Sequence, residues 1–300
     1  MKAELQKVLK GHSASVYCLC VDKGSSRIFS GSADQMLGAW SIEQLVPDGF
    51  SIKLDASVFS IHKSGQSLLL GQGSGGVHVF DLSARKEIRH LKYHTRPVFE
   101  IIAHATKPYF YFLGGDGVLS IVDSSDFALR WSLPLSEDKL RSAILDADGE
   151  RLLVGSSDGH IRILETEYYN VLSEIKAHEG GVYDMAWLAE EKLLTAGRDG
   201  HIRVWNYSNG EIVEKQAIPA HNFAIYSIDV SPSGKYFATG SRDKTVKIWD
   251  PEDLSNPLRI SRKGPIGHTH SVNVVRWIND GLLLSVGDDR DLHFWSISDS

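Results

Sequence analysis

The strongest constraint on the fold of this chain is a motif that recurs seven times along its 300 residues. In the clearest copy, residues 220–250, a His-containing loop precedes three short apolar runs, which are separated by turns. The tight turn before the third run carries a marker residue, which is Asp34, Ser74, Asp116, Asp158, Asp199, Asp243 or Asp289. Successive markers are 40, 42, 42, 41, 44 and 46 residues apart. A period of about 40–45 residues is typical of a four-stranded unit.

The segments between the turns favour β-strands. The runs at 182–187 and 246–249 are short and apolar, and turns rich in Gly, Ser and Asp bound them. Short strands divided by turn signals are typical of an all-β chain. No helical period of useful length and no Pro/Ser-rich linker interrupts this pattern.

Together, these features resemble the WD-repeat (WD40) family over essentially the whole chain. The resemblance implies an all-β fold, a seven-bladed β-propeller whose blades are four-stranded antiparallel sheets. We expect one domain over residues 1–300. Its repeats are expected at approximately 11–54, 55–92, 93–134, 135–176, 177–219, 220–266 and 267–297.

The two ends of the sequence predict how the ring closes. The last repeat stops after its third run, at 295–297, whereas residues 2–10 have strand length and belong to no repeat. We expect this N-terminal segment to supply the fourth strand of the last blade. Closure of this kind would remove two exposed sheet edges.

Four copies contain a His, a Ser or Thr, an Asp and a Trp, a set that could be mistaken for a catalytic triad. The sets are His12, Ser30, Asp34, Trp40; His178, Thr195, Asp199, Trp205; His221, Thr239, Asp243, Trp249; and His268, Ser285, Asp289, Trp295. A nucleophile site is normally built once, with its own oxyanion donors. The resemblance instead implies a hydrogen-bonded chain inside each blade, so we interpret these sets as structural tetrads and expect no catalytic residue.

The other three copies are incomplete. The third keeps His94 and Asp116, the fourth keeps Asp158, and the second has Ser74 and Phe80 at the Asp and Trp positions. We expect blades 2, 3 and 4 to be held mainly by apolar packing and to be the softer side of the ring.

Composition narrows the classes of function. The formal net charge of −6 provides no overall basic field, so nucleic-acid binding is disfavoured. No apolar run approaches the roughly 20 residues of a membrane span, and the charged N-terminus is unlike a signal peptide. Cys18 and Cys20 cannot form a disulfide framework and are expected to be small core residues. We expect a cytoplasmic, monomeric propeller within a complex, with no membrane association, metal or cofactor.

The resemblance also implies that partners bind the face that carries the His loops and Asp turns, around the central channel. One position in each copy, at the start of the innermost strand, is aromatic in five of seven cases. Around the ring this position is Tyr17, Phe59, Phe99, Arg141, Tyr183, Tyr226 and Asn273. Arg198 and Arg242 precede two marker Asp residues, and loop residues Arg96, Phe223 and His270 are expected on the same face.

Aromatic residues with several arginines are the side chains of a binding hot spot. We hypothesise that this face grips an extended peptide or loop of a partner protein, with arginines pairing its carboxylates. Three alternatives stay open: rings that merely pack the inner strands, an enzyme with a channel site, and a nucleic-acid-binding subunit that uses a local basic face. For the enzyme, Glu100 and Asp184 are two candidate metal ligands, fewer than the three expected of a catalytic site.

Overall fold

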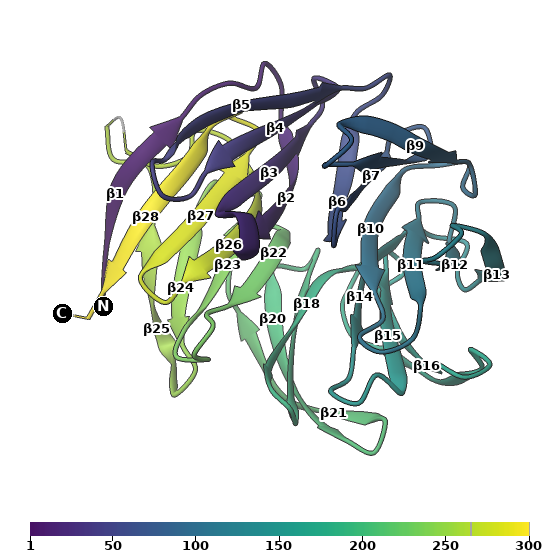
Figure 1. The fold of residues 1–300 in the computed structure, drawn as a ribbon. Helices are drawn as coiled ribbons and strands as arrows, with labels where there is room; N and C mark the ends of the chain where they lie inside the picture. Colours follow the sequence, from purple (N-terminus) through teal and green to yellow (C-terminus); the bar gives the residue numbers. More distant parts are fainter. Residues whose placement is uncertain (265, 300) are drawn as a thin grey trace.

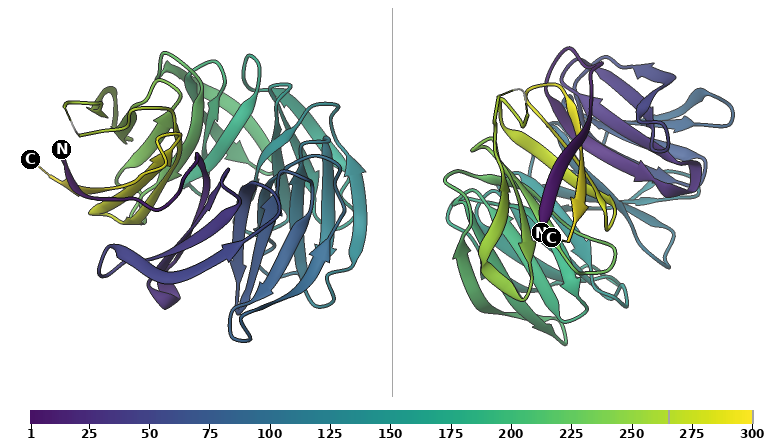
Figure 2. Two further views of the ribbon diagram at one scale, coloured as in Figure 1. Left: turned by 90° about the horizontal axis from the view of Figure 1, so that it is seen from above. Right: turned by 90° about the vertical axis from the view of Figure 1, so that its left-hand side faces the viewer.

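The computed structural model describes residues 1–264 and 266–299, in which each repeat forms one four-stranded antiparallel sheet. The seven sheets stand like blades around a common centre (Figures 1 and 2). The first strand of each blade contacts the first strands of both neighbouring blades, so these strands form the inner wall of a closed ring. The all-β, seven-bladed propeller predicted from the repeat is confirmed.

The first three blades follow the chain from its N-terminal side. Blade 1 consists of β2 (Val16–Asp22), β3 (Arg27–Ser32), β4 (Met36–Ser41) and β5 (Val46–Lys53), with the short 3₁₀ helix η1 (Lys23–Ser25) between its first two strands. Blade 2 consists of β6 (Val58–Ser64), β7 (Ser67–Gln72), β8 (Val77–Asp81) and β9 (Lys86–Leu91). Blade 3 consists of β10 (Val98–Ala103), β11 (Tyr109–Gly114), β12 (Val118–Asp123) and β13 (Leu129–Pro134).

The next three blades repeat this order, and blade 7 takes strands from both ends of the chain. Blade 4 consists of β14 (Leu140–Leu145), β15 (Arg151–Ser156), β16 (His160–Glu165) and β17 (Val171–Lys176). Blade 5 consists of β18 (Val182–Ala189), β19 (Lys192–Gly197), β20 (His201–Ser208) and β21 (Glu211–Pro219). Blade 6 consists of β22 (Ile225–Val230), β23 (Phe237–Ser241), β24 (Val246–Asp250) and β25 (Asp253–Ile260). Blade 7 consists of β26 (Val272–Asn279), β27 (Leu282–Gly287), β28 (Leu292–Ser298) and β1 (Lys2–Leu9).

The N-terminal strand closes the ring. β1 pairs antiparallel with β28, in a register that runs from Lys2 opposite Ser298 to Leu9 opposite Leu292. The two chain ends therefore lie side by side at the outer edge of blade 7 (Figure 2). This confirms the closure expected from the unmatched N-terminal segment.

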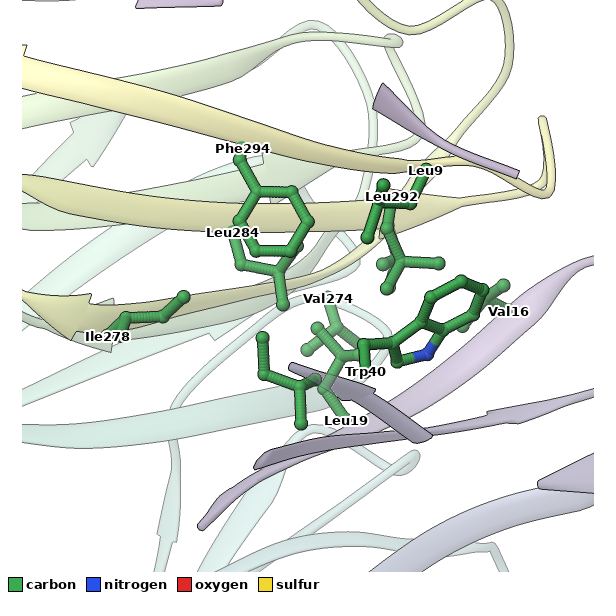
Figure 3. Packing of buried hydrophobic residues seen from close by; sticks show 11 residues of the cluster. Leu9, Val16, Leu19, Trp40, Val274, Ile278, Leu284, Leu292 and Phe294 are labelled. Atoms are coloured by element: carbon green, nitrogen blue, oxygen red, sulfur yellow. The ribbon is translucent and has the colours of Figure 1, made fainter. Parts of the chain in front are cut away.

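The hydrophobic core is divided among the gaps between neighbouring blades. In the described residues, each of the seven gaps holds one buried cluster. Where blade 7 meets blade 1, Trp40 and Leu19 of blade 1 pack against Leu284 and Phe294 of blade 7 (Figure 3). Leu9 of the closing strand joins the same cluster, so closure is stabilised by packing as well as by backbone hydrogen bonds. No described helix is long and apolar enough to cross a membrane.

Candidate functional site

The innermost strand of every blade carries a β-bulge at the same place, near its N-terminal end. In blade 1 the pairing with β3 passes from Val16 to Cys18 and skips Tyr17, and the other six blades show the same shift. A bulge bends its strand and re-aims the extra side chain. The skipped residues are Tyr17, Phe59, Phe99, Arg141, Tyr183, Tyr226 and Asn273, which are the seven residues predicted from their place after the His loop.

These seven side chains, which we call the belt, all line one central cavity of about 520 Å³. The rings of Tyr17 and Phe59 stack with centroids 4.7 Å apart, and Phe99 meets Phe59 edge-on at 5.5 Å. On the opposite side, Tyr183 stacks on Tyr226 at 5.7 Å. The guanidinium of Arg141 lies between the two groups of rings, 4.3 Å from the centroid of Phe99 and 4.8 Å from that of Tyr183.

Asn273 completes the belt through hydrogen bonds. Its amide Nδ2 donates to the carbonyl of Val16 at 3.0 Å and to Oδ1 of Asp288 at 2.8 Å. All seven belt residues are partly buried. The aromatic rings therefore pack on one another and also line the cavity. They hold the inner strands together and at the same time offer an accessible surface.

The remaining predicted binding residues are exposed on the rim above the belt. Arg96, Arg198, Phe223, Arg242 and His270 all belong to this group, and the Phe223 side chain is 58% exposed. The guanidinium of Arg242 lies 6.0 Å from the Phe223 ring centroid. Burial raises the pKa of the nearby Tyr226, and the charge of Arg242 partly opposes that rise. Within residues 1–264 and 266–299, Arg96, Arg198 and Arg242 form no ion pair.

Buried charges lie on the same inner strands below the belt. The backbone N–H of Ala143 donates to Oε2 of Glu100 at 2.5 Å. Asp184 accepts from the backbone N–H of Ile228 at 2.9 Å, and Asp229 accepts from that of Trp277 at 2.7 Å. Each carboxyl therefore binds the backbone of the next blade: Glu100 joins blade 3 to blade 4, Asp184 joins blade 5 to blade 6, and Asp229 joins blade 6 to blade 7. These acids join neighbouring blades.

The pKa values of these acids reflect their burial. Burial and the neighbouring Asp184 raise the pKa of Glu100 to about 8, so its carboxyl is mostly protonated at neutral pH. Burial also raises the pKa of Asp229 to about 6, although the charge of Arg276 opposes the rise. Arg276 lies 3.9 Å from Asp184 and is the cation among these groups. Sequence reasoning singled out Glu100 and Asp184 but missed Asp229 and Arg276, because neither lies at a motif position.

The four tetrads form continuous hydrogen-bonded chains inside their blades. In blade 5, Nδ1 of His178 lies 2.9 Å from Asp199, Nε2 lies 2.7 Å from the Thr195 hydroxyl, and Trp205 Nε1 donates to that hydroxyl at 3.0 Å. Equivalent contacts join His12, Asp34, Ser30 and Trp40 in blade 1; His221, Asp243, Thr239 and Trp249 in blade 6; and His268, Asp289, Ser285 and Trp295 in blade 7.

The tetrad carboxylates are stabilised in their charged form. Burial opposes the charge of Asp199, but hydrogen bonds from His178 and Arg203 outweigh it and hold the pKa of Asp199 well below its ordinary value. Burial in turn lowers the pKa of His178, against the opposing effect of Asp199. The Thr195 hydroxyl is 0% exposed. Each tetrad is therefore a closed internal network with no route for a substrate to the hydroxyl.

Blade 4 replaces the missing tetrad with a different polar network. Arg162 donates to Ser156 at 2.7 Å and to Asp158 at 2.9 Å, and the hydroxyl of Ser136 donates to Asp158 at 2.7 Å. The expectation that blade 4 depends mainly on apolar packing was therefore wrong. An arginine beside the marker Asp was not recognised as a substitute for the histidine.

Blade 2 also has its own network, and blade 3 keeps half a tetrad. In blade 2, His78 contacts Gln72 at 2.7 Å and Glu87 at 2.9 Å, so here too the apolar expectation was wrong. In blade 3, His94 contacts Asp116 at 3.0 Å, but its Nε2 has no hydrogen-bond partner because Phe112 replaces the hydroxyl. Among the described residues, blade 3 therefore keeps an incomplete tetrad, and the expectation that it is softer stays a prediction.

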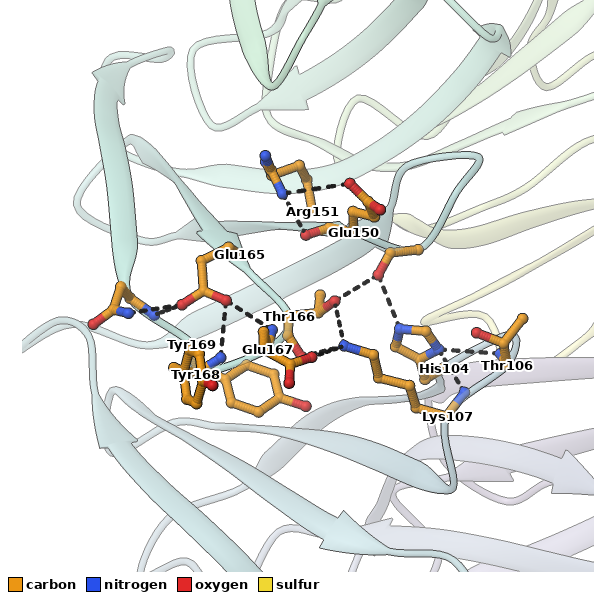
Figure 4. Close-up of polar contacts among 12 residues, drawn as sticks. His104, Thr106, Lys107, Glu150, Arg151, Glu165, Thr166, Glu167, Tyr168 and Tyr169 are labelled. Atoms are coloured by element: carbon orange, nitrogen blue, oxygen red, sulfur yellow. Dashed lines mark hydrogen bonds and ion pairs between the residues drawn. The ribbon is translucent and has the colours of Figure 1, made fainter.

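Blades 3 and 4 are joined again on the face opposite the belt (Figure 4). The carbonyl of Gly149 in blade 4 accepts from His104 Nε2 at 2.9 Å and from the hydroxyl of Thr166 at 2.7 Å. The ammonium of Lys107 donates to the carbonyl of Thr166 at 2.7 Å. Blade 3, whose tetrad is truncated, is therefore tied to its neighbour by polar contacts at both ends.

Among the described residues, two groups of side chains have the composition of a metal site, namely His78, Glu87 and His90, and His268, Asp289 and His293. In each group the two imidazoles are stacked, with centroids 3.9 Å and 4.1 Å apart. The nitrogen lone pairs of two stacked imidazoles lie in nearly parallel planes. Tetrahedral coordination requires the lone pairs of both rings to point at one metal ion. Both ring nitrogens of His78 and of His268 are also engaged by oxygen atoms.

Comparison with known proteins places these features in a family. The model of the WD domain, G-beta repeat, matches residues 3–41, 169–206, 213–250 and 261–296, which is half of the chain. The matched segments contain the four complete tetrads. A solved structure of the Cps50 (Swd1) β-propeller domain of Myceliophthora thermophila superposes with a TM-score of 0.83 at 18% identity, covering 99% of this chain and 100% of that chain.

Relatives in sequence include three proteins of different names. Apoptotic protease-activating factor 1 of Rattus norvegicus is 26% identical over 97% of this chain and 22% of its own length. WD repeat-containing protein 1 of Gallus gallus is 25% identical over 97% of this chain and 48% of its own length. The ribosome biogenesis protein WDR12 homolog of Nematostella vectensis is 27% identical over 48% of this chain and 41% of its own length. The matches span between about a fifth and a half of the length of these relatives. On the matched repeats and the ring of seven blades, the chain belongs to the WD40 repeat family.

Proposed function

We propose that this chain is a non-catalytic scaffold for protein interactions, and that its top face binds an extended peptide or loop of a partner protein. The top face is the face that carries the His loops and the marker turns. Membership of the WD40 family and the WD-repeat relatives support the general class of interaction scaffold. The binding surface is argued from the geometry of this chain.

The observation that carries the proposal is the combination of the belt with unpaired arginines above it. Arg96, Arg198 and Arg242 are exposed and, within the described residues, form no ion pair. Aromatic rings and arginines are the residues most enriched in binding hot spots. Such cations are free to pair with carboxylates of a partner, while the rings below supply apolar contact area.

One sector of the top face fits this purpose best. Blade 5 contributes Tyr183 to the belt and Arg198 to the rim, and blade 6 contributes Tyr226 and Arg242 in the same way. The exposed Phe223 adds an apolar surface beside Arg242. A segment that crosses these two blades would therefore meet the same pair of side chains twice, which suits an extended, acidic partner segment.

The arrangement gives less support to the other classes. The hydroxyls of the tetrads are 0% exposed, and two of the carboxyl groups that line the cavity, Glu100 and Asp184, bind backbone N–H groups of neighbouring blades. An enzyme would need at least one of these groups aimed at a substrate. The net charge of −6 also opposes binding to a polyphosphate backbone.

The proposal predicts that reversing two rim charges abolishes partner binding without lowering stability. In the Arg198→Glu/Arg242→Glu variant, each cation that would pair with a partner carboxylate becomes an anion, which repels it. We expect at least a tenfold loss of partner recovery in quantitative affinity capture with mass spectrometry, and an unchanged melting temperature.

The matched control is Arg85→Glu/Arg89→Glu, which makes the same charge change on two exposed residues of blade 2 away from the top face. This control should recover partners as the wild type does. Equal recovery by all three proteins would contradict the proposed binding face.

A further inference from the structure

Arg141 differs from every other member of the belt, because it alone is a cation. Its guanidinium lies between the rings of Phe99 and Tyr183, at 4.3 and 4.8 Å from their centroids. Among the described residues it forms neither a hydrogen bond nor an ion pair, so its donors face the cavity. A guanidinium has five N–H donors, and leaving them unmatched in a partly buried place is costly.

The carboxyl groups that line the cavity together with Arg141 are already engaged by other partners. Asp184 accepts backbone N–H groups and lies 3.9 Å from Arg276. Asp288 accepts from Asn273. Glu100 accepts from Ala143 and, because burial raises its pKa to about 8, carries little charge at neutral pH. The remaining cation nearby is Lys139, whose ammonium lies 5.9 Å from the Phe99 ring centroid.

We infer that Arg141, which is held between Phe99 and Tyr183, is a binding point for a single carboxylate, which a Glu or Asp side chain of the partner segment inserts into the central cavity. This inference rests on the proposed function and adds what the partner must carry at its central position. The carboxylate supplies the two oxygens that a guanidinium fork binds in parallel. The two rings hold the guanidinium plane in place, so little side-chain freedom is lost on binding.

The position of Arg141 supports a role in binding over one in folding. The other arginines with partners, such as Arg162 and Arg203, form ion pairs inside their blades. Among the described residues, Arg141 contacts the two rings and forms no ion pair, and burial lowers its pKa against the smaller opposing effect of charges that include Asp184. A cation that is partly desolvated and forms no ion pair is a candidate functional group. Lys139 adds positive potential at the same place and would assist capture of an anion.

The test uses peptides selected against the wild-type protein from a random 12-residue display library. Each Asp or Glu of the tightest peptide is changed to Asn or Gln, and binding to the wild type and to Arg141→Gln is measured by calorimetry. We expect one acid whose neutralisation weakens binding to the wild type at least tenfold but has little effect on the variant, because charge pairs of this kind are strongly coupled.

A second variant and the rim variant separate the possible outcomes. Arg141→Lys keeps the charge without the planar fork and should lose most of the same coupling, and both variants should melt as the wild type does. If Arg198→Glu/Arg242→Glu weakens the peptide but no acid couples to Arg141, this inference is wrong and the proposed binding face stands. If the rim variant has no effect, or if no peptide is selected, the proposed function fails as well.

Discussion

At the scale of single residues, four blades of this fold each contain a buried chain of hydrogen-bonded side chains. His178, Thr195, Asp199 and Trp205 form such a chain, in which the Thr195 hydroxyl contacts both the imidazole and the indole. Paired in this way, buried polar groups stabilise a unique structure, whereas an unpaired one costs about 1–3 kcal/mol. The hydroxyl is therefore the member on which the other polar groups depend.

Replacing Thr195 by Val should destabilise the protein markedly. The substitution keeps the shape of the side chain but leaves His178 Nε2 and Trp205 Nε1 without a partner in a buried place. Two unpaired groups predict a loss of about 2–5 kcal/mol in the free energy of unfolding, measured by urea denaturation. Ser173→Ala serves as the control, because the buried Ser173 hydroxyl already has no partner and its removal should be nearly neutral. Equal stability of the two variants would contradict this account.

At the scale of elements, the bulge of each innermost strand positions the binding residues, and the acids that follow two of these bulges join neighbouring blades. Phe99 is the skipped residue of β10, so it faces the cavity, and the next residue, Glu100, accepts the backbone N–H of Ala143 in β14. The same pairing of roles recurs at Tyr183 and Asp184. Each of these two bulges thus directs one side chain toward the cavity and the next toward the backbone of the neighbouring blade.

The stability of the protein should depend on pH through Glu100. Its pKa is about 8 in the folded protein, above the ordinary 4.5, so the folded state holds a proton that the unfolded state has lost between these values. Stability should therefore fall as pH rises from about 4.5 to 8, with a slope of at most about 1.4 kcal/mol per pH unit from this group. Glu100→Gln removes this contribution while keeping an acceptor for Ala143.

The difference between the two proteins isolates the effect of this one carboxyl. Relative to the wild type, Glu100→Gln should become steadily more stable between pH 4.5 and 8 and gain nothing further above that. The measurement is the free energy of unfolding in urea at several pH values. A difference that stays constant with pH would show that Glu100 is ionised in the folded state.

At the scale of the whole molecule, closure depends on one strand that is distant in sequence. β1 forms the outer edge of blade 7 through its pairing with β28, and Leu9 enters the core between blades 7 and 1. Without β1, blade 7 would have three strands and expose the edge of β28. An exposed edge is a template for pairing with other chains.

Deletion of the first ten residues should yield an insoluble protein or one with a melting temperature lower by several degrees. The reason is the loss of both the backbone pairing and the buried Leu9. The control is Lys2→Ser/Glu4→Ser, which removes an exposed ion pair but keeps the strand and should melt close to the wild type, since surface pairs contribute little. An unchanged melting temperature of the truncated protein would refute this role of β1.

The sequence predicted those parts of the molecule that repeat with the period, and missed those that do not. The seven blades and the belt residues follow from counting along aligned copies. Arg162 and His78 were missed because each blade substituted a different residue type for the tetrad. The bulge was missed because it depends on the register between two strands, which spacing along one strand does not reveal. The aligned repeats did predict Arg141 as a belt residue. That it forms no ion pair among the described residues depends on the positions of its neighbours in space, which the sequence does not give.

The pairing of β1 with β28 has a consequence for how the protein is made. β1 can pair with β28 only after residues 292–298 have been synthesised, so the last contact that closes the ring forms after all the strands between them have been made. Pairings between such distant segments are slow to form, because a very long loop must be closed first. Until β28 has been made, β1 has no partner strand and the ring cannot close at blade 7.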